Sequence, residues 1–199
     1  TQSKILLHYK SLIKTLRSRL LKRSMRFKDG LDEYPTWNEK KISEILKIGS
    51  GKDYKHLNAG TIPVFGTGGF MISVDDFLHN GETVCIGRKG TIDKPMYFNG
   101  KIWTVDTLFY THSFNFSRPK YIFHLFQTIN WFEYNEASGV PSLSKSTIEQ
   151  IVVEIPTVEE QDVIANFLFK LDSKIEIENS ILSRLEKQKK FLLQQIFVK

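Results

Sequence analysis

The segment that follows Pro156 contains neither glycine nor proline, the two residues that most often interrupt a helix. Thr157 and Glu160 stand at its start with the spacing of a capping box, in which each side chain bonds a backbone N–H of the first turn. The pattern predicts one helix from Thr157 to Phe197, about 60 Å long at about 1.5 Å per residue. One small domain cannot cover a helix of that length. The segment is therefore predicted to be an arm that packs on another helix and holds something at a fixed distance.

Apolar residues recur along this helix at alternating steps of four and three residues, the a/d spacing of a coiled-coil seam. Two seam positions are polar, Glu178 and Lys189, and such residues cost stability while they fix register and partner. The helix either folds back on its own domain or packs against the N-terminal segment, in the same chain or in a second copy, and we favour the N-terminal segment. The predicted helix–helix interface consists of Ile164, Leu168, Leu171, Ile175, Leu182, Leu185, Leu192 and Ile196.

The basic character of the chain comes from residues 1–28, which carry nine Lys/Arg and no Asp/Glu. Residues 29–156 carry twelve basic and fifteen acidic side chains, and residues 157–199 carry seven of each. The cations of residues 1–28 could neutralise DNA phosphates or could form the solvated face of a helix, so the net charge of +6 is weak evidence for DNA binding. This helix is predicted to end before Asp29-Gly30 and to present one apolar face, formed by Ile5, Tyr9, Leu12, Leu16 and Leu20.

Residues 35–156 are predicted to form one α+β globular domain with a mixed, antiparallel-rich sheet. Eleven of the twelve glycines lie between Ile48 and Gly139, where they separate short apolar runs that are typical of strands. The predicted strands are 62–65, 83–86, 95–98, 102–105, 108–110 and 152–155. Short helices are predicted after capping residues at Thr36 and Glu39, at Pro119, and at Ser146 and Glu149. The predicted domains are residues 1–34, the end of a helix and a linker; 35–156, the globular domain; and 157–199, the long helix.

Sequence motifs of catalysis are absent. There is no phosphate loop, dinucleotide fingerprint or metal-binding spacing of His or Cys, so no metal site is predicted. Asp32 with Glu39 resembles a nuclease carboxylate set only superficially, because Glu39 already has a predicted capping role. The single cysteine, Cys85, lies in an apolar run, so we expect a buried thiol and a reducing compartment. Without a signal peptide or a membrane-spanning run, the sequence predicts a soluble cytoplasmic protein.

Three glycine-rich loops, at residues 49–55, 66–70 and 87–91, are candidates for a binding surface. Each combines glycine with a hydroxyl side chain, and the first and third add Lys or Arg. Such loops bring backbone N–H groups and cations close to phosphates, and Arg or Lys can reach guanine edges in a major groove. Glycine turns are also expected in any strand-rich domain, so the loops alone leave the function open.

Five segments in order along the chain resemble a known family. They are residues 60–69, 86–92, 103–110 and 138–144, and the passage from Ile155-Pro156 through Glu159-Glu160-Gln161 into the long helix. Together they resemble a target recognition domain of the specificity subunit of type I restriction-modification enzymes, with the helix that follows such a domain. The resemblance runs over nearly the whole chain.

The resemblance implies a non-catalytic reader of double-stranded DNA in the bacterial cytoplasm. In this family a recognition domain reads one half of a bipartite site, helices set the spacing of the halves, and the helical region docks subunits that methylate adenine. Restriction subunits join that assembly, so S-adenosylmethionine, ATP and Mg²⁺ belong to partner subunits. Family members usually carry two recognition domains. This sequence has one, and it therefore resembles a C-terminal half or a half-length subunit that pairs with a second copy or a second recognition domain.

In this interpretation the cations and hydroxyls of the loops face DNA. The predicted DNA-binding residues are Lys52, Tyr54, Lys55, Thr67, Arg88, Lys89, Thr91, Ser142 and Lys145. The alternative hypothesis is a helical protein–protein scaffold without direct DNA readout, in which the glycine loops are only turns.

Overall fold

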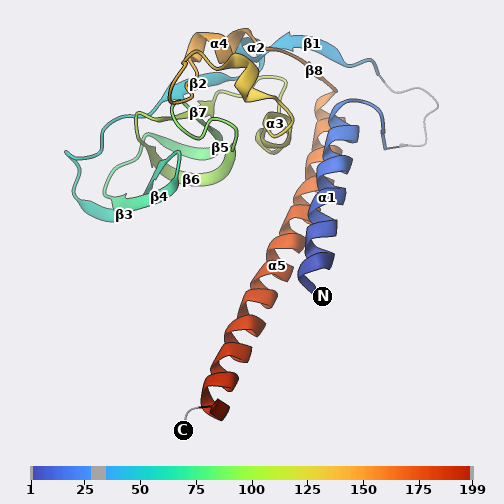
Figure 1. The fold of residues 1–199 in the computed structure, drawn as a ribbon. Coiled ribbons are helices and arrows are strands. Elements are labelled where there is room, and N and C mark those ends of the chain that lie inside the picture. Colours follow the sequence, from blue (N-terminus) through green and yellow to red (C-terminus); the bar gives the residue numbers. More distant parts are fainter. Residues whose placement is uncertain (1, 28–34, 198–199) are drawn as a thin grey trace. The chain divides into compact units, whose positions relative to one another are not determined.

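The computed structural model describes residues 2–27 and 35–197, and the chain divides into two compact units (Figure 1). One unit consists of residues 1–27 and 164–199, and the other of residues 28–163. The predicted α+β class is confirmed. Asp29-Gly30, Asp32 and the predicted domain boundary at residue 34 lie outside the described residues.

The larger unit is built on a six-stranded sheet. Its strands are β2 (Lys47–Ser50), β3 (Ala59–Gly66), β4 (Gly69–Val74), β5 (His79–Gly87), β6 (Met96–Thr104) and β7 (Leu108–His112). Their order is β2-β7-β5-β6-β3-β4, and neighbouring strands are antiparallel except β3 and β6, which are parallel. Apolar side chains of the central strands, such as Val84, Ile86 and Ile102, have no exposed surface. Burial of these side chains is what favours the sheet.

Two predictions for the sheet are wrong in detail. The runs 95–98 and 102–105 belong to one strand, β6, which continues through Gly100 at a φ of +129°, a backbone conformation open mainly to glycine. The glycine-rich run after Phe65 is the turn of a hairpin, and β4 begins within it at Gly69. The sequence gives no strand signal for β4 because Phe70, Met71 and Ile72 are consecutive, exposed and apolar, without the alternation of a half-buried strand.

A separate two-stranded antiparallel ladder joins β1 (Asn38–Lys41) to β8 (Val152–Ile155). The helix predicted from Thr36 and Glu39 is therefore wrong in position, because residues 38–41 pair with a strand more than a hundred residues away, and that pairing overrides a local helix signal. A helix forms only at α2 (Ile42–Ile45), where the Lys41 N–H donates to the Glu44 carboxylate at 2.6 Å.

The helix α3 (Pro119–Phe126) begins at the predicted proline and packs against β5 and β6. Its buried face includes Tyr121, Ile122 and Phe126. After it, Trp131 opens the 3-10 helix η1 (Trp131–Tyr134) and donates its indole N–H to the Phe126 carbonyl at 2.8 Å. The Phe126 and Trp131 rings meet edge to face with centroids 5.2 Å apart, which closes this end of the core.

The helix α4 (Lys145–Gln150) is capped by Ser144, whose hydroxyl accepts the Thr147 N–H at 3.1 Å. The predicted cap at Ser146 is therefore wrong by two residues. Leu143 and Ile148 are both buried on either side of the first turn, the arrangement of a hydrophobic staple. Burial of this pair fixes the helix register and places Ser144 at the cap.

The smaller unit contains α1 (Gln2–Leu21) and the part of α5 (Val158–Phe197) that begins at Ile164. The Arg17 guanidinium donates to both carboxylate oxygens of Asp172, at 2.9 and 2.8 Å. The rings of Phe27 and Phe167 meet edge to face with centroids 5.1 Å apart. Burial raises the pKa of Asp172 more than the Arg17 guanidinium lowers it.

The predicted apolar face of α1 is wrong in part. Ile5, Tyr9 and Leu12 are 44% to 53% exposed, Leu16 is half-buried, and only Leu20 of the predicted set is buried. The buried face is displaced by one residue from the predicted one, with Leu6 in place of Ile5 and Ile13 in place of Leu12, and it has the seven-residue repeat that keeps one face against a partner helix. This buried repeat is formed by Leu6, Ile13 and Leu20.

The long helix α5 begins one residue later than predicted. The Glu160 N–H donates to the Thr157 hydroxyl at 3.4 Å, as one half of the predicted capping box requires. The other half of a capping box is a bond from the Thr157 N–H to the Glu160 carboxylate. The Glu160 carboxylate accepts the indole N–H of Trp37 at 3.2 Å. None of the helices in residues 2–27 and 35–197 combines the length and the apolar character needed to cross a membrane.

Exposure of the predicted seam residues rises along α5. Ile164 and Leu168 are buried, whereas Leu171, Ile175 and Leu182 are half-buried, and Leu185, Leu192 and Ile196 are 46%, 57% and 71% exposed. Within the described residues, α1 lies beside the earlier part of the seam only (Figure 1). The later part leaves an apolar stripe in contact with solvent.

Candidate nucleic-acid interface

The loop after β5 is held by backbone hydrogen bonds to two distant segments. The N–H groups of Arg88 and Lys89 both donate to the Thr107 carbonyl, at 2.8 and 3.2 Å. The Gly90 N–H donates to the Pro141 carbonyl at 2.8 Å, and the Leu143 N–H donates to the Arg88 carbonyl at 2.9 Å. The chain therefore brings residues 88–90, 106–107 and 141–143 together at one place.

Two glycines are required by the shape of this loop. A Cβ at Gly87 would lie 2.0 Å from the Thr91 carbonyl oxygen, so a side chain there collides with backbone. Gly90 has a φ of +89°, in the left-handed region that side chains rarely adopt. The Gly90 Cα faces the hairpin turn of β3 and β4, because a Cβ there would lie 3.6 Å from the Thr67 hydroxyl.

The segment that precedes α4 is organised by Asn135. Its amide oxygen accepts the N–H groups of Ala137 and Ser142, at 3.1 and 2.9 Å, and its amide nitrogen donates to the Ala137 carbonyl at 2.7 Å. The Thr147 hydroxyl donates to the neighbouring Glu136 carboxylate. Hydrogen bonds from Thr147 and then Ser144 lower the pKa of Glu136, so this carboxylate is ionised at neutral pH.

Two adjoining cavities open on these loops. A cavity of about 390 Å³ is lined by residues 88–89, 106, 107, 109 and 142–145 together with Ser50 and Glu136. A second cavity of about 720 Å³ is lined by segments 53–55, 66–71 and 105–107. Asp106 and Thr107 belong to both walls, so the two cavities form one continuous concave surface, hereafter the loop surface.

Seven of the nine predicted DNA-binding residues line the loop surface. Arg88, Lys89, Ser142 and Lys145 line the smaller cavity, and Tyr54, Lys55 and Thr67 line the larger one. The other two do not line either cavity. The Lys52 backbone is bound to β6, because its N–H donates to the Thr104 carbonyl and its carbonyl accepts the Trp103 indole N–H. Thr91 is half-buried.

The Arg88 guanidinium has a defined environment on this surface. Its carbon lies 5.7 Å from the centroid of the Phe109 ring, within range of a cation–π contact, and its Nη1 donates to the Asp106 carbonyl at 3.4 Å. Support of this kind orders the side chain while the rest of its donor fork stays available. Arg is the side chain that most often reads guanine, through two donors to O6 and N7.

Acidic side chains are interleaved with the cations of the loop surface. Asp53, Asp106 and Glu136 line its walls. Lys145 lies 3.6 Å from the Glu149 carboxylate, an ion pair one helical turn apart. The loop surface therefore combines donors and acceptors at close quarters and does not form a uniformly basic patch.

Sequence reasoning missed Asp106, Thr107 and Phe109 in the walls of this surface, and it missed Asn135, which organises the segment before α4. Thr107 and Phe109 act through the fold, as a backbone acceptor and as a ring beneath Arg88. Asp106, Thr107 and Phe109 lie within the run 103–110 that carried part of the resemblance, and Asn135 lies three residues before the segment 138–144. Position in or near those segments was the only signal available.

A family model described as the type I restriction modification DNA specificity domain matches residues 34–187. This range includes every segment of the loop surface and more than half of the chain. The chain belongs to the type I restriction-modification DNA specificity domain family. The predicted membership is confirmed.

Relatives of known type agree with this membership. The specificity subunit of the type I restriction enzyme EcoprrI from Escherichia coli is 26% identical over 153 residues, which are 71% of this chain and 37% of the relative. The S subunit of the type I restriction-modification system from M. genitalium has a similar fold, with a TM-score of 0.79 and 18% identity over 100% of this chain and 56% of that structure.

A further solved chain, from work on complex assembly and conformational transition of the type I restriction-modification system, has a TM-score of 0.63 and 15% identity. The match covers 98% of this chain and 57% of that chain. The chain thus spans about half the length of these two solved chains and less than two fifths of the curated relative. At these identities the structural likeness establishes the fold of the specificity domain.

Proposed function

We propose that residues 35–156 read one half of a bipartite DNA target and that the chain itself is non-catalytic. The observation that carries the proposal is the convergence of five chain segments on one concave surface, with seven predicted DNA-binding side chains in its walls. Arg88, supported by the Phe109 ring, is the best placed side chain for a guanine edge. Lys55, Lys89 and Lys145 supply further cations for bases or phosphates.

The interleaved acids support base reading over broad phosphate binding. A carboxylate repels phosphate, but it accepts a hydrogen bond from the amino group of cytosine. Asp106 and Glu136 stand beside Arg88 and Lys89, so neighbouring positions of the surface differ in the bases that they favour. A surface of this kind discriminates sequences better than it attracts DNA in general.

The uncovered stripe of α5 supports docking of other subunits. Leu185, Leu192 and Ile196 remain largely exposed, and exposed apolar patches of this kind mark protein interfaces. We propose that this stripe pairs with a second recognition domain or a second copy, and that the helical region docks DNA adenine methylation subunits, which restriction subunits join. In this proposal S-adenosylmethionine, ATP and Mg²⁺ bind to the partner subunits and not to this chain.

The deciding experiment is methylome sequencing of bacterial cells that express this chain with its methylation subunits. Replacing residues 48–155 with the equivalent region of a relative, while both flanking helices are kept, should change one half of the methylated site and leave the other half and the spacing intact. An unaltered methylated sequence after the swap would show that residues 48–155 are not the recognition element.

A protein-only scaffold is the second candidate, and the exposed stripe of α5 is the observation that favours it. A gel shift at low salt with the cognate methylation subunits separates the two functions. The scaffold predicts that substitutions on the loop surface leave the shift unchanged, whereas a DNA reader predicts that Arg88→Ala weakens it.

A further inference from the structure

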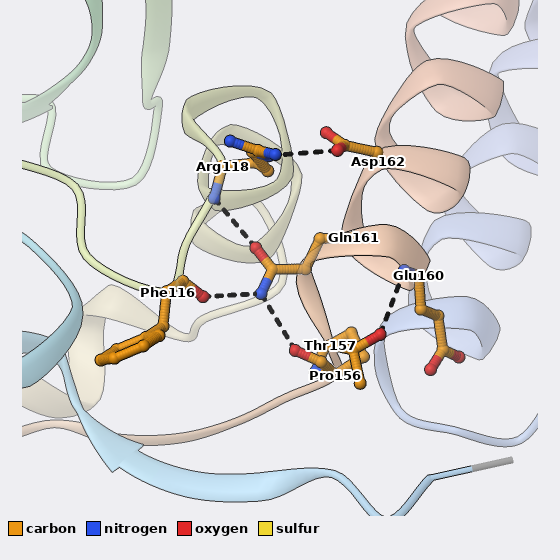
Figure 2. A network of polar contacts seen from close by, with 7 residues as sticks. All are labelled: Phe116, Arg118, Pro156, Thr157, Glu160, Gln161 and Asp162. Atoms are coloured by element: carbon orange, nitrogen blue, oxygen red, sulfur yellow. Dashed lines mark hydrogen bonds and ion pairs between the residues drawn. The ribbon is translucent and has the colours of Figure 1, made fainter.

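Gln161, in the first turn of α5, has no exposed surface and bonds three backbone groups. Its amide nitrogen donates to the carbonyls of Phe116 and Pro156, at 2.9 and 3.0 Å, and its amide oxygen accepts the Arg118 N–H at 2.9 Å (Figure 2). Two of these groups precede α3, and the third lies between β8 and α5. One side chain therefore joins the start of α5 to two other segments of the larger unit.

Only an amide of this length meets all three demands. The Phe116 and Pro156 carbonyls require two donors, and the Arg118 N–H requires an acceptor. A carboxylate is an acceptor only, so it would keep the bond to Arg118 and oppose both carbonyls. An apolar side chain would leave all three backbone groups without this partner, and buried polar groups are rarely left so.

The backbone at Phe116 adds to this argument. Phe116 has a φ of +52°, in the left-handed region that is uncommon for residues with a side chain. Its ring is 69% exposed, so burial of the ring does not hold this conformation. Polar contacts on both sides do: the Asn115 N–H and the Ser117 hydroxyl donate to the Ile45 carbonyl, at 2.8 and 2.6 Å, and Gln161 donates to the Phe116 carbonyl.

Arg118 connects this network to the loop surface. Arg118 is the N-cap residue of α3, and its side chain makes no capping hydrogen bond to that helix. Its guanidinium Nε instead donates to the Asp162 carboxylate at 3.1 Å (Figure 2). The helix α3 packs against β5 and β6, and β5 ends at Gly87, where the Arg88-Lys89 loop starts. A continuous series of packed elements therefore runs from the first turn of α5 to the loop surface.

We propose that Gln161 is a positioning residue that joins the start of the spacer helix to the recognition domain, so that the spacing of the target is read together with its bases. The proposal rests on the proposed function, in which α5 sets the distance between half-sites. Gln161 itself has no contact with DNA in this role. Its loss should relax the spacing while the bases of the half-site stay the same.

The test is Gln161→Glu in the full chain, co-expressed with its methylation subunits and read by methylome sequencing. We expect methylation at the native spacing, relative to spacings one base pair longer or shorter, to fall roughly tenfold, because the Phe116 and Pro156 carbonyls both lose their donor. The half-site sequence should not change. The matched control is Gln188→Glu, the same chemical change at an exposed position of the same helix, which should leave the ratio unaltered.

A second measurement does not depend on whether the variant folds. In the unmodified chain, the Arg118 amide should exchange its hydrogen as slowly as amides of the central sheet, since Gln161 accepts from it. Exchange at the rate of an exposed amide would overturn the proposal, as would a folded Gln161→Glu chain with unchanged spacing. If the unmodified chain directs no methylation at all, the proposed function fails and not this inference.

Discussion

Gly87→Ala is the substitution that most directly tests how the recognition loop is built. The change leaves every cation of the loop surface in place and adds one methyl group at the end of β5. That methyl would lie 2.0 Å from the Thr91 carbonyl oxygen and 3.0 Å from the Ile92 Cα. Ordinary contact begins at 3.4 Å, so the backbone of the loop must move by about 1.4 Å. Neither neighbour is the end of a flexible side chain, so the movement falls on the loop itself.

The expected cost has two parts. Overpacking of this kind destabilises a domain by about 1–3 kcal/mol. In a chain of this size each kcal/mol lowers the melting temperature by about 2–4 °C, so thermal unfolding should shift down by roughly 2–12 °C. Displacement of Arg88 should also remove its share of base discrimination, about 1–3 kcal/mol or roughly 5- to 150-fold at the base it reads.

The assays are thermal unfolding of the purified chain and methylome sequencing with the methylation subunits. Gly139→Ala is the matched control, because a Cβ at Gly139 meets nothing within 4 Å and that glycine is not left-handed. The control should behave like the unmodified chain in both assays. A Gly87→Ala chain that melts at the original temperature and methylates the original sites would refute the reasoning, since the close approach would then impose no constraint.

Three further tests address the loop cations, the seam of α5 and the buried thiol. Arg88→Ala should reduce discrimination at the base it reads by about 1–3 kcal/mol. Lys89→Ala should lower the slope of log affinity against log salt by about one, while Lys190→Ala on α5 should not, as fluorescence anisotropy with the methylation subunits would show. Leu168→Ala should cost about 2–5 kcal/mol in urea unfolding because Leu168 is fully buried, whereas Leu192→Ala, at 57% exposure, should stay within about 0.5 kcal/mol and weaken only association. Burial raises the pKa of the Cys85 thiol to about 12, so iodoacetamide at pH 8 should label the unfolded chain and spare the folded one.

The sequence predicted those elements whose own residues carry the structural information. The capping-box spacing of Thr157 and Glu160 placed the start of α5 to within one residue. The apolar run around Val84 and Ile86 marked the core of β5, and Pro119 marked the start of α3. In each case the preference is local, so neighbouring residues suffice to predict the element.

Elements that depend on distant partners were mispredicted. The residues of β1, Asn-Glu-Lys-Lys, have no strand preference and are extended because β8 pairs with them. The buried face of α1 is decided by α5, and Leu6 and Ile13 could not be chosen over Ile5 and Tyr9 from α1 alone. A partner that lies far away in the sequence decides the outcome at both places.

The same division applies to the loop surface. Arg88, Lys89 and Lys55 were predicted because cations beside glycines have a recognisable chemistry. Asn135 was missed, since its role depends on the return of residues 137–142 to its amide, which no local pattern announces. Gln161 was noticed only as part of the resemblance, because its three partners lie on segments that the fold alone brings together.

The charge of the recognition domain leads to a prediction about its affinity. Residues 29–156 carry fifteen acidic and twelve basic side chains, and acids stand beside the cations of the loop surface. Affinity for DNA in general grows with the number of phosphates that a protein neutralises, and so does the salt dependence. The isolated chain should therefore bind its target weakly and with a shallow salt slope.

Adding the methylation subunits should then raise the affinity and steepen the slope, because those subunits must supply most of the phosphate contacts while this chain supplies the base contacts. Anisotropy titrations from about 50 to 200 mM salt, with target DNA and with DNA altered in one half-site, separate the two contributions. The half-site change should alter the affinity of the complex without altering its slope. Tight binding by the isolated chain, with a slope that the methylation subunits leave unchanged, would contradict this division of labour.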